Sequence, residues 1–111
     1  MHEKIFMTNS TEAQKRKAVR REYSTLFDAL SQLLFAADPV GINFETNTDE
    51  YDPEVGTIIP RLQHANTKDD VLQIIHEEFC TWFDAETAGP IGAYVEIAGK
   101  VWDEWQRYRR L

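Results

Sequence analysis

The sequence has a single cysteine, Cys80, and no long apolar run. One thiol cannot form a disulfide within the chain, and this scarcity is typical of proteins in a reducing compartment. A membrane-spanning helix needs about 18 or more consecutive apolar residues, and the chain has no such run. The apolar stretch in the opening residues MHEKIFMTNS is too short for a signal peptide. We therefore expect a cytoplasmic protein without membrane insertion, in which residues 1–10 form a frayed extension.

The motifs that mark common enzyme classes are also missing. The chain contains no GxGxxG, P-loop, GxSxG or CxxC pattern. This removes the usual signatures of dinucleotide binding, phosphate binding, serine hydrolysis and thiol redox chemistry. We therefore assign no catalytic residue, no cofactor and no metal, and we expect a protein that is not an enzyme.

The apolar residues that are present suffice for one core. The chain is 111 residues long and 42% hydrophobic, and it contains three Trp, four Tyr and six Phe. This length is close to the usual size of one domain and too short for two ordinary ones. We expect a single domain over residues 1–111 that folds without disulfides or metal.

Charge is distributed unevenly along the chain. Residues 1–27 carry six basic and three acidic side chains, and residues 87–111 carry four basic and three acidic ones. Between them, residues 28–86 carry thirteen carboxylates against two basic side chains, within a formal net charge of −7. Such an acidic centre repels phosphate backbones and disfavours nucleic-acid binding. The simpler interpretation is that acidic surface keeps the protein soluble.

Helical periodicity predicts a long first helix. From residue 19 onward, apolar residues recur at spacings of three and four, which places them on one helix face. Ser10 or Thr11 can cap the start. Asp38 and Pro39 end the helix, because the residue before proline disfavours helical backbone. The expected bounds are about 12–36.

Three more helices are expected after it. Asp52 can cap a second helix and Pro53 suits its first turn, while Gly56 and Pro60 predict a kink or break near residues 56–60.

The third and fourth helices have clearer signals. Thr67 is a cap for a third helix at about 68–83, followed by first-turn carboxylates that complement the helix dipole. The segment AETAGP ends it, and a fourth amphipathic helix runs from Pro90 to the basic C-terminus. The predicted fold is all-α, a single compact domain of about four helices, with a long acidic loop at 38–52.

The central stretch resembles DUF1871, a family of small bacterial helical proteins of unknown function. The likeness covers about residues 37–83, where a helix ends at Asp-Pro, an acidic Asp-Glu-Tyr-Asp-x-Glu segment follows, and two helices come next. The matching positions are Asp38, Pro39, Gly41, Asp49, Glu50, Tyr51, Asp52, Glu54, Ile58, Leu62, Ile74, Ile75, Phe79 and Phe83. The resemblance implies a compact helical domain and brings no catalytic residue with it.

His76 and Cys80 are the first candidates for chemistry, since residues four apart share a helix face. Two ligands do not make a zinc site, and no third ligand is evident. Cysteine nucleophiles are usually activated at helix N-termini, whereas Cys80 is expected near a C-terminus. An ordinary helix with a partly buried thiol is the simpler interpretation.

The acidic run from Thr48 to Glu54 is the second candidate. It has oxygen ligands for calcium but lacks the glycine turn and the distant bidentate Glu of an EF-hand loop. Asp52 as a cap and Glu54 in the first helical turn explain part of the run. Tyr51 is an aromatic residue among carboxylates, a composition that interfaces favour. We therefore predict a partner-binding site at Asp49, Glu50, Tyr51 and Glu54.

Three classes of function follow. The leading one is a non-enzymatic protein-binding domain, such as a bacterial immunity or antitoxin factor whose acidic surface covers a basic protein partner. The alternative is a stand-alone homodimer formed through aromatic surface on the fourth helix, and a small enzyme or metal-binding protein comes last. The basic segments KRKAVRRE and RYRR would form a nucleic-acid patch if they met, but a solvated helix face is the simpler interpretation.

Overall fold

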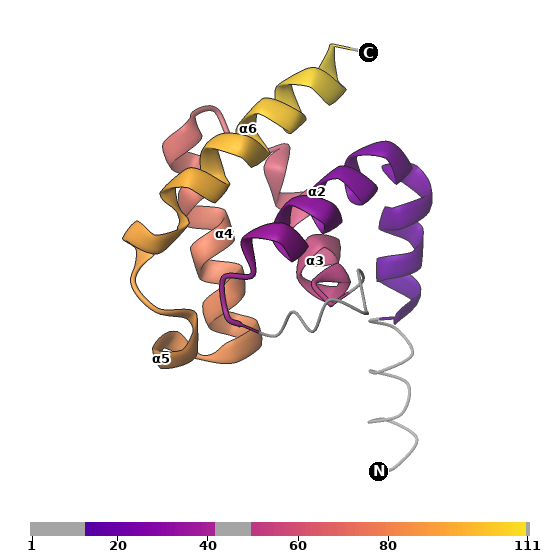
Figure 1. The fold of residues 1–111 in the computed structure, drawn as a ribbon. Coiled ribbons are helices and arrows are strands. Elements are labelled where there is room, and N and C mark those ends of the chain that lie inside the picture. The colour runs from indigo at the N-terminus through magenta and orange to yellow at the C-terminus, as the bar shows by residue number, and fades with distance from the viewer. Residues whose placement is uncertain (1–12, 42–49, 111) are drawn as a thin grey trace, which may run out of the picture.

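A computed structural model describes residues 13–41 and 50–110, which fold as helices joined by short connections (Figure 1). The described residues contain no β-strand, so the all-α prediction is confirmed. No helix in these two ranges is both long enough and apolar enough to cross a membrane.

The helices are more numerous than expected. A helical segment at 13–22 is followed by α2 (Ser24–Ala37), α3 (Asp52–Leu62), α4 (Lys68–Phe83), α5 (Ala85–Ala88), the 3-10 helix η1 (Ile91–Tyr94) and α6 (Val95–Arg109). The prediction of four helices is therefore wrong in three places. The first helix divides at Tyr23, AETAGP contributes α5, and the last helix begins as η1.

The division at Tyr23 redirects the chain. Tyr23 has φ −117° and ψ 37°, and the segment 13–22 turns away from α2 in Figure 1. Backbone hydrogen bonds continue across the bend, from the Tyr23 N–H to the Val19 carbonyl at 2.9 Å and from the Phe27 N–H to the Tyr23 carbonyl at 2.7 Å. The segment 13–22 thereby leaves the line of α2 and lies against α3. The candidate caps Ser10 and Thr11 lie outside the described residues.

The expected long acidic loop is also different in the structure. The end of α2 is as predicted: Asp38 adopts left-handed backbone, φ 49°, and its N–H donates to the Leu34 carbonyl at 2.7 Å. Residues 42–49 lie outside the described ranges. Asp52, expected at the end of the loop as a helix cap, belongs to the first turn of α3, and Glu54 lies in that turn as predicted.

The helix α3 is continuous through Pro60, so of the kink or break predicted near residues 56–60, the break is wrong. A proline ring clashes with the backbone four residues earlier. Here that residue is Gly56, and Pro60 lies in the last turn, so only the end of the helix is affected. The proline near the start, Pro53, occupies the first turn as predicted.

The bounds of α4 match the prediction of 68–83. Thr67 and Asp70 form a capping box in which the Asp70 N–H donates to Thr67 Oγ1 at 3.1 Å and the Thr67 N–H donates to Asp70 Oδ2 at 3.2 Å. This reciprocal pair satisfies backbone donors that the first helical turn leaves open.

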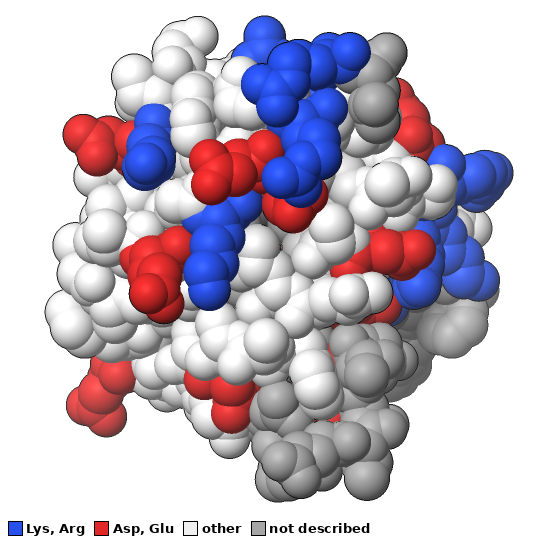
Figure 2. Space-filling model, turned by 45° about the horizontal axis from the view of Figure 1, so that its top comes forward, with Lys and Arg blue, Asp and Glu red and all other residues white. Residues whose placement is uncertain are grey.

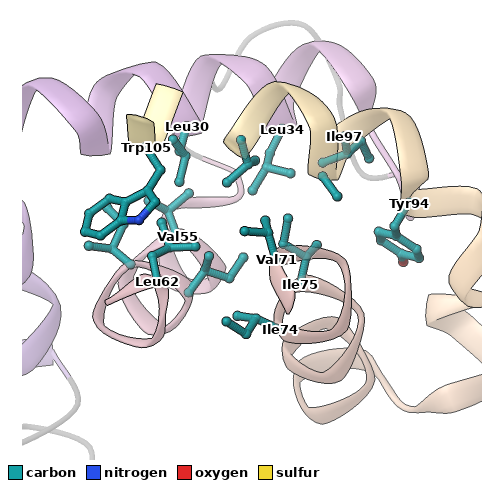
Figure 3. Packing of buried hydrophobic residues seen from close by; sticks show 14 of the residues in the cluster. Leu30, Leu34, Val55, Leu62, Val71, Ile74, Ile75, Tyr94, Ile97 and Trp105 are labelled. Atoms are coloured by element: carbon teal, nitrogen blue, oxygen red, sulfur yellow. The ribbon is translucent and has the colours of Figure 1, made fainter. Parts of the chain in front are cut away.

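The core lies where α2, α3, α4 and α6 converge (Figure 3). Its fully buried side chains include Phe27, Leu30, Leu34, Tyr51, Val55, Ile59, Leu62, Val71, Ile75, Phe79 and Tyr94. Burial of each large apolar side chain stabilises the fold by about 1.5–3 kcal/mol. Trp105 of α6 is also buried, whereas Trp82 of α4 and Val95 of α6 are the large apolar residues that stay exposed in the described part of the chain.

Candidate functional site

The acidic segment that the sequence suggested as a partner site is largely turned inward. Asp49 lies outside the described residues, and Glu50 is half-buried in the turn before α3. Tyr51 is completely buried, with its ring 5.9 Å from that of Phe79. Its hydroxyl donates to Asp38 Oδ1 at 2.7 Å, which ties the start of α3 to the end of α2. The prediction of Tyr51 as an exposed interface anchor is therefore wrong.

Asp52 joins three helices instead of capping α3. One carboxylate oxygen accepts from Arg20 of the segment 13–22 at 3.0 Å, and the other accepts from the Ser31 hydroxyl of α2 at 2.6 Å. No side-chain hydrogen bond caps α3, so the predicted capping role of Asp52 is wrong. This network fixes the segment 13–22 against α2 and α3.

Glu54 is a buried carboxyl, only 3% exposed. Its Oε1 atom is buried without a hydrogen-bond partner. Burial disfavours the charged form and raises the pKa of Glu54 to about 7, although a hydrogen bond from its own backbone and the positive charge of Arg16 act in the opposite direction. Glu54 cannot contact a partner with its side chain in this structure, which corrects its assignment to the partner site.

Most other carboxylates of the acidic centre have structural partners. Glu77 and Glu78 both pair with Arg61, at 2.7 and 2.9 Å. Asp84 accepts from the Thr87 N–H at the start of α5, and this hydrogen bond holds the Asp84 pKa below its usual range. On the face that Figure 2 shows, acidic side chains are dispersed among basic and uncharged ones. The excess of acidic residues therefore does not form one continuous acidic surface on that face.

The His76 and Cys80 pair is close, with His76 Nε2 3.6 Å from the Cys80 sulfur. The same nitrogen lies 2.8 Å from the Gly89 carbonyl oxygen. A carbonyl can only accept, so Nε2 carries the proton and donates it there. That nitrogen then has no lone pair for a metal ion or for the thiol proton. In residues 13–41 and 50–110, no cluster of three or more His, Cys, Asp or Glu could hold a metal.

His76 and Tyr94 instead hold the connection between α4 and α6. The two rings are 5.5 Å apart, and the Tyr94 hydroxyl donates to the Ala88 carbonyl at 2.6 Å. Together with the bond from His76 to Gly89, this fastens α5 and the turn after it to the core. We assign the pair a structural role.

A groove of about 480 Å³ lies between the segment 13–22, α3 and the end of α4. Its lining residues are Lys15, Arg16, Ala18, Val19, Pro53, Gly56, Thr57, Pro60 and Trp82. We call this the Trp82 groove. Most of these side chains are apolar, and the two charged ones are both cations. A second hollow of about 320 Å³ shares Arg16 and Pro53 with it and is also lined by Lys17 and Arg20.

Trp82 is held in a defined position in the groove. The side chain is 39% exposed, yet its indole N–H donates to Thr57 Oγ1 at 3.0 Å. The Thr57 hydroxyl in turn donates to the Glu54 carbonyl at 3.1 Å. An exposed aromatic ring is thus fixed to α3 by its polar edge, while its apolar surface faces the groove and solvent.

The opposite wall of the groove depends on Gly56. A Cβ atom at this position would lie 3.0 Å from Arg16 Cγ, so the absence of a side chain lets the stem of Arg16 lie on α3. Lys15, Lys17 and Arg21 are exposed on the same helical segment, and none of the three forms an ion pair with another described residue. The wall is therefore cationic.

The second basic segment, RYRR at residues 107–110, contacts other residues of α6. Arg107 pairs with Glu104 at 2.8 Å, and the Arg109 guanidinium lies over the Trp105 ring, 5.6 Å from its centroid. Arg107 and Arg109 therefore both contact residues of α6 itself. These contacts argue against a nucleic-acid patch that would use their charges.

Comparisons with known proteins give no match. No protein-family model matches the chain, and neither the curated proteins nor the solved structures contain a significant relative. The resemblance to DUF1871 therefore stays a prediction from the sequence pattern.

Proposed function

We propose that the chain is a non-enzymatic protein-binding domain and that its binding site is the Trp82 groove. The observation that carries this proposal is the fixed, exposed ring of Trp82 beside a groove of about 480 Å³. Tryptophan is enriched among the residues that dominate binding energy at protein interfaces. A preformed groove next to such a residue suits an inserted side chain or a docked helix of a partner.

The two narrower ideas from the sequence have weaker support. An immunity or antitoxin factor with an acidic working surface would need its carboxylates free, whereas Asp52, Glu77, Glu78 and Asp84 are bound within the chain. A homodimer through aromatic residues of α6 would need those rings exposed. Trp105 is buried, and Trp102 and Tyr108 pack against the core.

The proposal is tested by capture with the full chain as bait in a lysate of its own host. Trp82→Ala removes the exposed ring, and Val95→Ala is the matched control, because Val95 is also exposed but lies outside the groove lining. We expect a partner that the native chain and Val95→Ala retain equally and that Trp82→Ala retains at least about tenfold less, as for a binding hot spot. Retention of every captured protein by Trp82→Ala, with the fold intact by circular dichroism, would overturn the proposal.

A further inference from the structure

We infer that the Trp82 groove accepts an acidic amphipathic segment of another protein, an inference that rests on the proposed function. One apolar side chain of that segment packs on Trp82 and Val19, and its carboxylates face Lys15 and Arg16. The partner is thus of the opposite charge to the one that the overall composition suggests.

The Trp82 groove has a largely apolar lining. Val19, Pro60 and Trp82 come from three different helical elements and line the same hollow. Large apolar residues exposed beside a concavity mark binding surfaces more often than isolated ones do. Since the indole N–H is already bonded to Thr57, the ring presents apolar area, and the complementary group is an aliphatic or aromatic side chain.

The segment 13–22 supplies the charged residues of the groove. It carries five basic side chains and one acidic side chain, within a chain of net charge −7. Arg20 forms ion pairs with Asp52 and Asp28, whereas the side chains of Lys15, Lys17 and Arg21 are exposed to solvent. Lys15 and Arg16 are the charged residues that line the groove, and Arg16 also lines the neighbouring hollow, which contains Asp52 as well. Positive charge therefore lies along the side of the groove that the segment 13–22 forms. Carboxylates placed at intervals along a bound segment would match it.

Nucleic acid fits these observations less well. Binding to a phosphate backbone draws its affinity from many cations over a wide surface, whereas this groove is short and mostly apolar in its lining. The net charge of −7 also opposes the approach of a polyanion. A protein segment can combine a few carboxylates with an apolar anchor.

The test is a selection from a charge-unbiased random peptide library displayed on phage, with the full chain as target. We expect enriched peptides that combine carboxylates with a large apolar residue. Lys15→Glu should weaken their binding by about tenfold or more at low salt. Lys100→Glu is the matched control, an exposed lysine on α6 that does not line the groove, and it should change binding by less than about twofold.

The outcomes separate this inference from the proposed function. Enriched peptides that are basic or neutral, and are lost in Trp82→Ala, would overturn the acidic partner while keeping the groove as the site. An absence of any peptide that depends on Trp82 or Lys15 would overturn both. The inference would also fail if a single-stranded oligonucleotide competed with the peptides for the groove, or if the chain alone formed a dimer that Lys15→Glu dissociates.

Discussion

Replacing Glu54 by glutamine should stabilise the protein above neutral pH and remove much of its pH dependence. The pKa of Glu54 is raised from 4.5 to about 7 in the folded chain, so between these values the folded state keeps a proton that the unfolded state has lost. The free energy of unfolding therefore falls as pH rises from about 4.5 to about 7. A shift of this size corresponds to about 3 kcal/mol, since one pKa unit is about 1.4 kcal/mol. A neutral amide has no such ionisation.

Urea unfolding followed by circular dichroism at a series of pH values measures this effect directly. At about pH 8 we expect Glu54→Gln to be more stable than the native chain by up to about 3 kcal/mol, and at about pH 4.5 we expect the two to be similar. Glu22→Gln is the matched control, because Glu22 is exposed, and it should keep the native pH profile. If Glu54→Gln kept the native slope, or were the less stable protein at about pH 8, the inference of an unfavourably buried carboxyl would be refuted.

Three further predictions concern stability. Asp52→Asn weakens the network with Arg20 and Ser31 and should lower the free energy of unfolding by about 1–3 kcal/mol in urea titrations; an unchanged value would mean that the network does not fasten the segment 13–22. Thr67→Ala removes half of the capping box and should cost about 1 kcal/mol, seen as a lower melting temperature. A chelator should leave the melting temperature of the native chain unchanged, and a large fall would indicate a metal site that includes His76 or residues outside the described ranges.

The sequence predicted those elements whose signals are local. Thr67 with its first-turn carboxylates defined α4, and Asp38 with Pro39 defined the end of α2. The bend at Tyr23 has no local signal, because neither glycine nor proline is nearby and the apolar spacing continues across it. The bend follows from tertiary packing: the segment 13–22 lies on α3, whereas α2 packs on α6.

The site was harder to predict for the same reason. Tyr51 stands among carboxylates in the sequence, which favoured an exposed position, yet it is buried against Phe79. The burial of Glu54 depends on elements distant in the chain. The Trp82 groove is formed by three segments, and no spacing in the sequence indicates that they lie side by side. The basic run at 15–21 was recognisable in the sequence, but only as a charged helix face.

Two charge-reversed variants, compared for their affinity toward the captured partner, test whether the Trp82 groove is the binding surface. The affinity is measured by titration calorimetry at low salt. If the Trp82 groove is the binding surface, Lys15→Glu should weaken binding by about tenfold or more, and the double variant Asp49→Lys with Glu50→Lys should bind as the native chain does. Native affinity in Lys15→Glu, together with a large loss in the double variant, would contradict the claim and return the binding site to the acidic segment.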